Sequence, residues 1–231
     1  MALLRLGLVT FYTTFCTGNV RSQDCDEAMN KTGNIGIFGG TFNPIHIGHL
    51  MIAELALEAY ELEQVIFVPS YHPPHKDSDV IDAVYRYEMT AAAVSDNPRF
   101  TISDVEFKRE GPSYTIDTVK YFHTVYGEDK TYYFIAGTDT IQDLPNWKYI
   151  DELLPLCHFI GAIRPDGSEG IDNIIEHFGE LGKRRIHRLI VPTMKLSATD
   201  LRARLREGRT IRYMVPQAVV KYIQEHNIYK K

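Results

Sequence analysis

The sequence predicts an α/β protein built on a doubly wound, Rossmann-like sheet that is mostly parallel and carries helices on both faces. From Asn34 onward, short apolar runs alternate with amphipathic stretches, which is the pattern of successive βαβ units. The apolar runs contain few polar residues, as expected for parallel strands that are buried on both faces. With 231 residues, of which 44% are hydrophobic, the chain can bury the core of one such domain.

Six apolar runs fit the strands of one sheet. In chain order they are Asn34 to Phe38, Gln64 to Val68, Phe100 to Ser103, Tyr132 to Ala136, His158 to Ile163 and His187 to Val191. All six are short and mostly apolar, so we expect them to be buried and to pair in parallel.

Amphipathic stretches between these runs predict the covering helices. The first helix is expected from Gly48 to Tyr60, because its apolar residues share one face and its glutamates face away. Other helices are expected at Ala83 to Ser95, Ser113 to Tyr126 and Thr199 to Glu207, and a last one opens with Pro216 at its first position and buries Val219, Val220 and Ile223. The segment Arg164 to Arg185 is rich in glycine and charge, so we expect a mobile surface loop there.

Residues 1 to 28 are interpreted as a dispensable or disordered tail, and residues 29 to 231 as a single domain. The stretch from Arg5 to Phe15 vaguely resembles a secretory signal, but threonines dilute its apolar part and no small-residue cleavage site follows. A second methionine, Met29, stands just before the first strand. An unused upstream start is therefore favoured over an export signal.

Charge and cysteine content exclude several classes of partner. A net charge of −5 gives no overall attraction to nucleic acid, so a polyanionic ligand must be met by a local cluster of cations. No apolar run reaches the roughly 18 residues that a membrane helix needs. Cys16, Cys25 and Cys157 lack metal-like or redox-like spacing, and their odd number argues against a secreted disulfide framework. We expect a cytoplasmic protein.

The most informative segment runs from Gly36 to His49, between the first strand and the first helix. Its glycines let the backbone approach a ligand closely, and the helix start offers N–H groups with a partial positive charge. His46 and His49 can then point into one phosphate site. Two alternatives stay open, in which the histidines bind zinc or are merely polar residues at a helix start. Zinc needs more ligands, and no nearby cysteine or acidic residue supplies them.

A second phosphate site is suggested at Ser197 to Arg202. Ser197 and Asp200 have the spacing of a capping box, so a helix begins here. Its N–H groups, the Thr199 hydroxyl and Arg202 can grip a phosphate together. Taken alone, the segment is better explained as a plain capped helix.

Two further side chains stand out. Lys76 follows the second strand on a proline-rich loop, at the edge where open α/β sheets bind ligands, although a solvated surface lysine is an equal alternative. Trp147 is the only tryptophan and lies between polar neighbours, which favours a ring platform at a pocket edge over a place in the core.

Together these segments resemble the HxGH nucleotidyltransferases and, within them, bacterial nicotinate mononucleotide (nicotinate-nucleotide) adenylyltransferases, over nearly all of residues 34 to 229. The matching segments, in order, are Gly39 to His49, Pro73 to Lys76, Gly111 to Thr115, Phe134 to Asp139, Leu144 to Trp147, Arg164 to Pro165 and Ser197 to Arg202. The HxGH segment alone is specific only to the superfamily, whereas the ordered set is specific to this enzyme family. The resemblance implies transfer of the adenylyl group of ATP to nicotinate mononucleotide, with release of pyrophosphate.

The resemblance also implies roles for the matching residues. Its catalytic residues would be His46, His49 and Arg202, which act on the ATP phosphates. ATP would further be bound by Gly39, Gly40, Thr41, Phe42, Gly137, Asp139, Ser197 and Thr199, and the mononucleotide by Asn43, Lys76, Thr115, Trp147 and Lys148. Trp147 would stack on the pyridine ring, whose carboxylate would meet backbone groups near Thr115 and Lys148. Mg²⁺ would be held mainly by ATP phosphates and water, without metal ligands from the protein.

This sequence departs from the family pattern at two positions. Asn43 stands where many members carry Asp, and Ala198 stands where many carry a second Ser. Ala198 lacks a hydroxyl donor, while the helix start and Arg202 remain.

Beyond ATP and nicotinate mononucleotide, we expect no nucleic acid or membrane partner, and a homo-oligomer stays open. The nearest alternative function is a nucleotidyltransferase that acts on phosphopantetheine or an alcohol phosphate. A noncatalytic nucleotide-binding module is a second alternative, against which both histidines and Arg202 argue.

Overall fold

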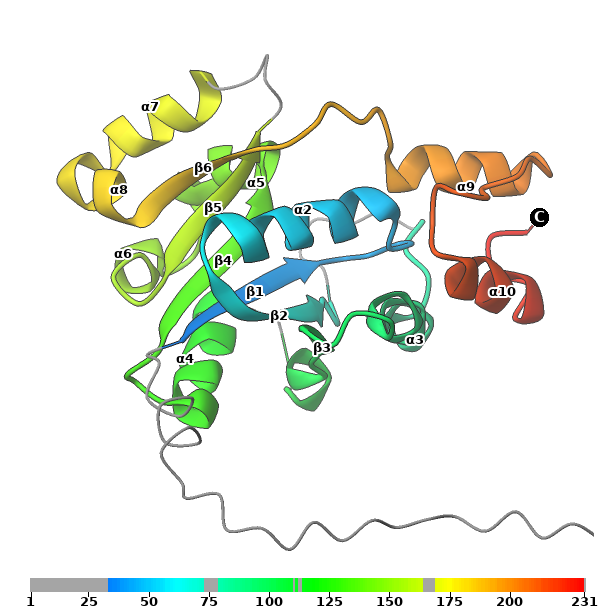
Figure 1. The fold of residues 1–231 in the computed structure, drawn as a ribbon, viewed down its shortest axis with the longest axis horizontal. Helices are drawn as coiled ribbons and strands as arrows, with labels where there is room; N and C mark the ends of the chain where they lie inside the picture. Colours follow the sequence, from blue (N-terminus) through cyan, green and yellow to red (C-terminus); the bar gives the residue numbers. More distant parts are fainter. Residues whose placement is uncertain (1–32, 73–78, 110, 112–113, 164–168, 231) are drawn as a thin grey trace, which may run out of the picture. The chain divides into compact units, whose positions relative to one another are not determined.

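The computed structural model describes residues 33–72, 79–109, 111, 114–163 and 169–230. Its centre is a sheet of six parallel strands in the order β3-β2-β1-β4-β5-β6. The strands are β1 (Asn34–Gly40), β2 (Leu62–Pro69), β3 (Phe100–Ile102), β4 (Thr131–Gly137), β5 (His158–Ile163) and β6 (Ile186–Ile190). The predicted fold class and all six predicted strands are confirmed, with boundaries shifted by up to two residues (Figure 1).

Helices cover both faces of the sheet (Figure 1). They are α2 (Ile47–Ala59), α3 (Ala83–Val94), α4 (Thr115–Tyr126), α5 (Thr138–Gln142), α6 (Ile150–Leu153), α7 (Glu169–His177), α8 (Gly179–Arg185), α9 (Ala198–Arg206) and α10 (Gln217–Glu225), with short 3-10 helices η1 (Val105–Lys108) and η2 (Leu144–Asn146). One hydrophobic cluster joins one face of the sheet to α2, α3, α9 and α10, and a second joins the other face to α4, α5, α6 and α7.

The prediction of a loop from Arg164 to Arg185 is wrong for residues 169 to 185, which form α7 and α8. Ile171 and Ile175 lie one helical turn apart and are buried in the second cluster, while most of the charged residues described in these helices are exposed. The high content of glycine and charged residues therefore obscured the amphipathic pattern of these two helices. Residues 164 to 168 lie outside the described part of the chain.

The ends of the predicted helices need smaller corrections. The last helix begins at Gln217, so Pro216 is its N-cap rather than its first residue. Its carbonyl accepts hydrogen bonds from Val219 and Val220, both of which are buried as predicted. The predicted start of α4 at Ser113 lies outside the described residues, and α5 and α6 were not predicted because each has five residues or fewer.

Strand order positions the functional site. β1 and β4 are neighbours in the sheet, because β1 lies between β2 and β4. The helices that follow them, α2 and α5, pack in different hydrophobic clusters. Doubly wound sheets bind ligands at this kind of switch point, in the crevice beyond the carboxyl ends of the strands.

None of the helices in the described part of the chain has the length and apolar composition of a membrane-spanning helix.

Candidate active site

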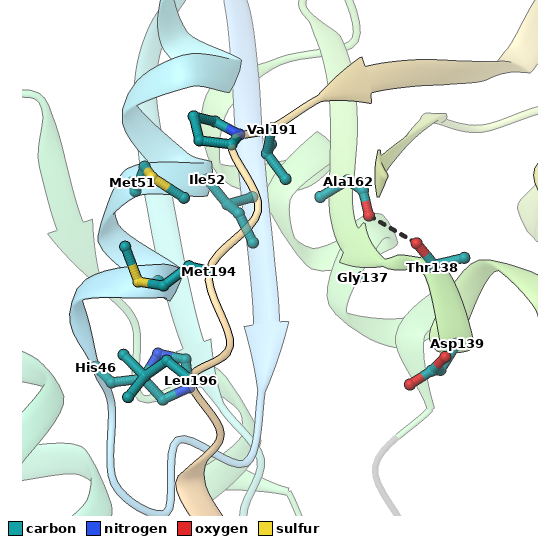
Figure 2. A pocket seen from close by; sticks show the side chains of 12 residues that line it. His46, Met51, Ile52, Gly137, Thr138, Asp139, Ala162, Val191, Met194 and Leu196 are labelled. Carbon is teal, nitrogen blue, oxygen red and sulfur yellow. Dashed lines mark hydrogen bonds between the residues drawn. The ribbon is translucent and has the colours of Figure 1, made fainter. Parts of the chain in front are cut away.

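A pocket of about 490 Å³ opens at this switch point. Its lining comes from the start of α2, the ends of β4 and β5 and the segment after β6, and comprises His46, Gly48, Met51, Ile52, Gly137, Thr138, Asp139, Ala162, Val191, Pro192, Met194 and Leu196. Figure 2 shows His46, Met194 and Leu196 on one side of it and Gly137 and Asp139 on the other. The lining is thus largely apolar, but it also contains the imidazole of His46 and the carboxylate of Asp139.

The carboxyl end of β1 and the loop that follows it pack closely around Gly39 and Gly40. A Cβ atom on Gly39 would lie 2.8 Å from the ring of Phe134, and one on Gly40 would lie 2.8 Å from the ring of Phe42. Both rings would have to move to admit any larger residue. Phe42 itself adopts a left-handed backbone conformation with φ 46°. The loop is therefore a specific, tightly packed turn that ends at His46, the N-cap of α2.

His46 and His49 stack on each other, with ring centroids 3.7 Å apart and an interplanar angle of 18°. The backbone N–H of His46 donates a hydrogen bond to Nδ1 of His49 across 3.2 Å. Because Nδ1 accepts here, a neutral His49 must carry its proton on Nε2. His49 is therefore oriented as an Nε2–H donor at the start of a helix, where anions bind favourably.

His46 is a buried polar residue of the pocket wall, with 8% of its surface exposed. Burial lowers the pKa of His46 to about 4, so the ring is neutral near pH 7. Its Nδ1 atom is buried and faces the backbone N–H of His49 in a capping-box arrangement, without a hydrogen bond of ordinary geometry among the described residues. A buried nitrogen with so weak a partner is costly, and His46 also lines the pocket, so its ring is suited to a hydrogen bond with a bound ligand.

The zinc alternative for these histidines finds no support in the surroundings. Among the described residues, no three His, Cys, Asp or Glu side chains are grouped so that they could hold a metal ion. Nδ1 of His49 is also engaged by the backbone of His46. The pair therefore fits a phosphate site better than a structural zinc site.

Across the pocket, β4 runs directly into α5 at Gly137. A Cβ atom on Gly137 would meet no atom within 4 Å, so the space beside this residue is open to a ligand. Thr138 is held in place by a 2.9 Å hydrogen bond from its hydroxyl to the carbonyl of Ala162 on β5 (Figure 2). Asp139 is exposed in the first turn of α5 and lines the pocket.

Arg202 of α9 is held in a ring of polar contacts. Its Nε donates to Asp79 Oδ2 at 2.9 Å, and its Nη1 donates to the carbonyl of Asn43 at 2.9 Å. Arg206, one turn further along α9, binds the same carboxylate. Hydrogen bonds from Arg206 and Arg202 hold the pKa of Asp79 below its ordinary value. The Arg202 side chain is 12% exposed, so a phosphate would meet an arginine that is already oriented.

Asn43 closes this ring from the side of the β1–α2 loop. The residue is 4% exposed, its Nδ2 donates to the carbonyl of Asp79 at 2.9 Å, and its Oδ1 accepts from the hydroxyl of Tyr229 at 2.6 Å. The side-chain amide is thus used on both sides. In this arrangement Asn43 joins the loop, Asp79 and the C-terminal segment.

The start of α9 has the predicted cap. Ser197 is the N-cap, and its hydroxyl accepts a 3.1 Å hydrogen bond from the backbone N–H of Asp200. Thr199 Oγ1 lies 3.4 Å from Nη2 of Arg202 and accepts from it. This short helix adjoins the pocket through Leu196.

Trp147, Thr115 and Lys148 lie apart from the pocket lining. Trp147 is half-buried against the second cluster, edge-on to Phe134 at 5.7 Å and to Phe159 at 6.2 Å. Lys148 donates to the hydroxyl of Tyr114 at 3.2 Å, and this hydrogen bond raises the pKa of Lys148. Trp147 therefore packs against the core and keeps part of its ring exposed, and its role as a platform stays a prediction. Phe134 connects the two regions, because the carboxyl end of β1 packs against it at Gly39.

Comparison with known proteins decides the family. The cytidylyltransferase-like family model matches residues 37–204. A protein of Thermoanaerobacter sp. (strain X514) named "Probable nicotinate-nucleotide adenylyltransferase" is 45% identical over 206 residues, covering 88% of this chain and 97% of its own length. One of Moorella thermoacetica with the same name is 45% identical over 206 residues, covering 87% and 94%. This chain belongs to the nicotinate-nucleotide adenylyltransferases of the cytidylyltransferase-like family.

A solved structure agrees with the fold of this adenylyltransferase. The Plasmodium falciparum nicotinic acid mononucleotide adenylyltransferase complexed with NaAD superposes with a TM-score of 0.71 at 20% identity, covering 85% of this chain and 97% of that one. The same arrangement of strands and helices thus persists at low sequence identity.

The structure brings together only some of the predicted site residues of the adenylyltransferase. His46, Gly137 and Asp139 line one pocket, and the ring around Arg202 lies beside it. Trp147, Thr115 and Lys148 occupy a different surface, and Lys76 lies outside the described residues.

Sequence reasoning missed three residues that organise this site, namely Asp79, Arg86 and Tyr229. Arg86 is the one that left a signal in the sequence, because it stands between Ala83, Met89 and Ala93 on the apolar face of α3. An arginine in that register is buried and must find acceptors. Asp79 and Tyr229 gave no comparable signal.

Proposed function

We propose that the chain catalyses attack of the phosphate of nicotinate mononucleotide on the α-phosphorus of ATP. A new P–O bond joins the two nucleotides, the bond between the α- and β-phosphates breaks, and pyrophosphate leaves. The observation that carries this proposal is the switch-point pocket, where a buried neutral imidazole, a helix start and an oriented arginine adjoin. Membership of the adenylyltransferase family supports the same reaction.

The site suits a reaction that needs positioning and charge stabilisation rather than a protein nucleophile. His49 would donate Nε2–H to a phosphate oxygen as negative charge develops there. His46 would form a hydrogen bond to the ligand through its neutral ring, which lines the pocket. Arg202 would add a fixed positive charge whose direction Asp79 and Asn43 already define.

ATP would lie along the pocket with its phosphates at the start of α2. The backbone of Gly39, Gly40, Thr41 and Phe42 would approach the phosphate chain, and Ser197 and Thr199 would contact it from the start of α9. Gly137 leaves open space beside β4 for the adenosine, and the Asp139 carboxylate can accept hydrogen bonds from ribose hydroxyls.

Nicotinate mononucleotide would lie on the side of β4 that carries Trp147. Its pyridine ring would stack on the exposed part of Trp147, and N–H groups near Thr115 and Lys148 would receive its carboxylate. Lys148 adds a positive charge that Tyr114 holds near this surface. Lys76 and Asn43 would contact its phosphate. Asn43 would do so through its backbone, because its side-chain amide already has hydrogen-bond partners on both sides.

A Mg²⁺ ion would accompany ATP. Among the described residues no cluster of three ligating side chains exists, and Asp139 is the one carboxylate that lines the pocket. These donors fit an ion carried by ATP phosphates and water. The bound ion would neutralise charge on the phosphate chain. We place the enzyme in the cytoplasm.

The experiment is a substrate panel with the purified protein. Release of pyrophosphate is measured with ATP plus nicotinate mononucleotide, nicotinamide mononucleotide, phosphopantetheine or an alcohol phosphate. Turnover with nicotinate mononucleotide and formation of the dinucleotide support the proposal. Turnover only with another acceptor, or no pyrophosphate release with any acceptor, would refute it.

A further inference from the structure

Arg86 is the most deeply buried charged residue in the described part of the chain, with 1% of its surface exposed. It lies on α3, outside the pocket lining. No carboxylate forms an ion pair with it among the residues that the structure describes, although the charges of Asp82 and Glu106 act on it from further away. Burial of an unpaired guanidinium is expensive, so its hydrogen-bond partners must hold it in place.

The guanidinium donates to three backbone carbonyls from separate segments. Nη1 donates to Thr41 at 2.8 Å, Nη2 donates to Tyr71 at 3.2 Å, and Nε donates to Ile81 at 3.1 Å. Thr41 belongs to the β1–α2 loop, Tyr71 follows β2, and Ile81 precedes α3. One buried cation thus ties the phosphate-binding loop to the two neighbouring loops.

The contact with Thr41 has a directional consequence. In a trans peptide the carbonyl and the following N–H point in opposite directions. Nη1 fixes the Thr41 carbonyl and therefore aims the N–H of Phe42 away from Arg86. A charge-assisted hydrogen bond to the carbonyl also polarises the peptide, which strengthens that N–H as a donor.

We propose that Arg86 is a positioning residue for adenylyl transfer, which acts through the Thr41–Phe42 peptide to hold the phosphate-binding loop in its reactive conformation. The proposal rests on the phosphate-binding role proposed above for the β1–α2 loop. A planar guanidinium can serve three carbonyls at fixed angles, whereas an ammonium at this depth cannot reproduce that fork.

The test compares Arg86→Lys with the wild type and with Met89→Val. Met89 is fully buried one turn along the same helix and is apolar, so its replacement reports the cost of perturbing α3 without removing a hydrogen bond to the loop. For Arg86→Lys we expect kcat per folded molecule to fall about 10- to 100-fold while KM for both substrates changes less than about threefold. For Met89→Val we expect a lower thermal midpoint with kcat per folded molecule near that of the wild type.

Hydrogen exchange separates positioning from general destabilisation. In Arg86→Lys, the peptide spanning residues 39 to 46 should exchange faster than in the wild type, while peptides of α4 exchange at an unchanged rate. Equal kcat in Arg86→Lys and the wild type, or losses matched by Met89→Val, would overturn the proposal.

A measurement on the wild-type protein covers the case in which Arg86→Lys does not fold. The ¹⁵N–¹H signals of Arg86 Nε and the Phe42 amide should shift together on saturation with ATP, and the amide of Met89 should not. An unchanged Arg86 signal would overturn the proposal. Loss of pyrophosphate release in the wild type itself would instead count against the proposed function.

Discussion

Nε of Arg202 donates a hydrogen bond to Oδ2 of Asp79 across 2.9 Å, although the two residues are 123 positions apart in the chain. The same carboxylate binds Arg206, and the carbonyl of Asp79 accepts from Asn43. Asp79 therefore orients Arg202 but also places a negative charge beside the proposed phosphate site. These two effects act in opposite directions on ATP.

Asp79→Asn should separate the orientation of Arg202 from the effect of the negative charge, because asparagine keeps an acceptor for Nε of Arg202 and removes the charge. Removing one charge within roughly 10 Å of the phosphates should lower KM for ATP about three- to tenfold at low ionic strength. The decrease should shrink as salt is added. KM for ATP measured at low and high salt checks this, and a KM that rises at both salt concentrations would mean that orientation of Arg202 dominates.

His49→Ala should lower kcat on the order of 10²-fold or more, as for loss of one preorganised donor, with a much smaller change in KM for ATP. The hydrogen bond from His46 N–H to Nδ1 allows a sharper comparison. Gln reaches the position of Nε2 with an N–H donor, whereas Asn reaches only the position of Nδ1 with an acceptor. We expect His49→Gln to retain more turnover and His49→Asn more thermal stability. Near-normal turnover in His49→Ala with a depressed midpoint would assign His49 to the scaffold.

Trp147→Phe should keep the edge-on packing against Phe134 and Phe159 and reduce the surface available to the pyridine ring. Its kcat/KM for nicotinate mononucleotide should fall about two- to tenfold, the range of one aromatic contact.

In the wild type, nicotinate mononucleotide should be preferred over the nicotinamide form and should change the emission of the single tryptophan. Equal use of both mononucleotides, with unchanged emission, would contradict this placement of the substrate.

The stability of the fold should depend on a histidine pair far from the pocket. His158 Nδ1 lies 2.7 Å from His187 Nε2, beside the ring of Tyr133 and close to Arg185. Burial, Arg185 and His187 lower the pKa of His158 to about 4, below its unfolded value near 6.5. The unfolded chain therefore binds more protons between these values, and stability is lost as pH falls from about 6.5 toward 4.

Replacing His158 should make the free energy of unfolding depend less on pH. His158→Phe cannot bind the proton in either state, so its free energy of unfolding should fall less between pH 7 and pH 5 than that of the wild type. Because the lowered pKa of His46 adds a dependence of the same sign, some loss should remain. Urea denaturation at both pH values measures the difference, and parallel losses in the two proteins would exclude His158 as the cause.

A chain that begins at Met29 should fold and keep full activity, because the sequence of residues 1 to 28 has neither the family pattern nor the pattern of a strand. Thermal midpoint and specific activity of the shortened and full-length proteins provide the comparison. A large loss of either would show that the first 28 residues contribute to the domain.

The sequence alone determined the parallel sheet, its six strands and the loop with His46 and His49. These features are local: a buried parallel strand must be a short apolar run, and a helix start that binds phosphate needs its glycines and polar residues close together in the chain. The cap of α9 at Ser197 was readable for the same reason.

Tertiary structure alone decided which polar groups meet. Asp79 reaches Arg202 and Tyr229 reaches Asn43 because the strand order folds distant segments onto one sheet edge, which no local spacing encodes. Packing also decided that Arg86 is buried and that residues 169 to 185 form helices, since in both cases the outcome depends on which face meets the core. The protonated nitrogen of His49 likewise follows from a backbone donor whose direction exists only in the folded turn.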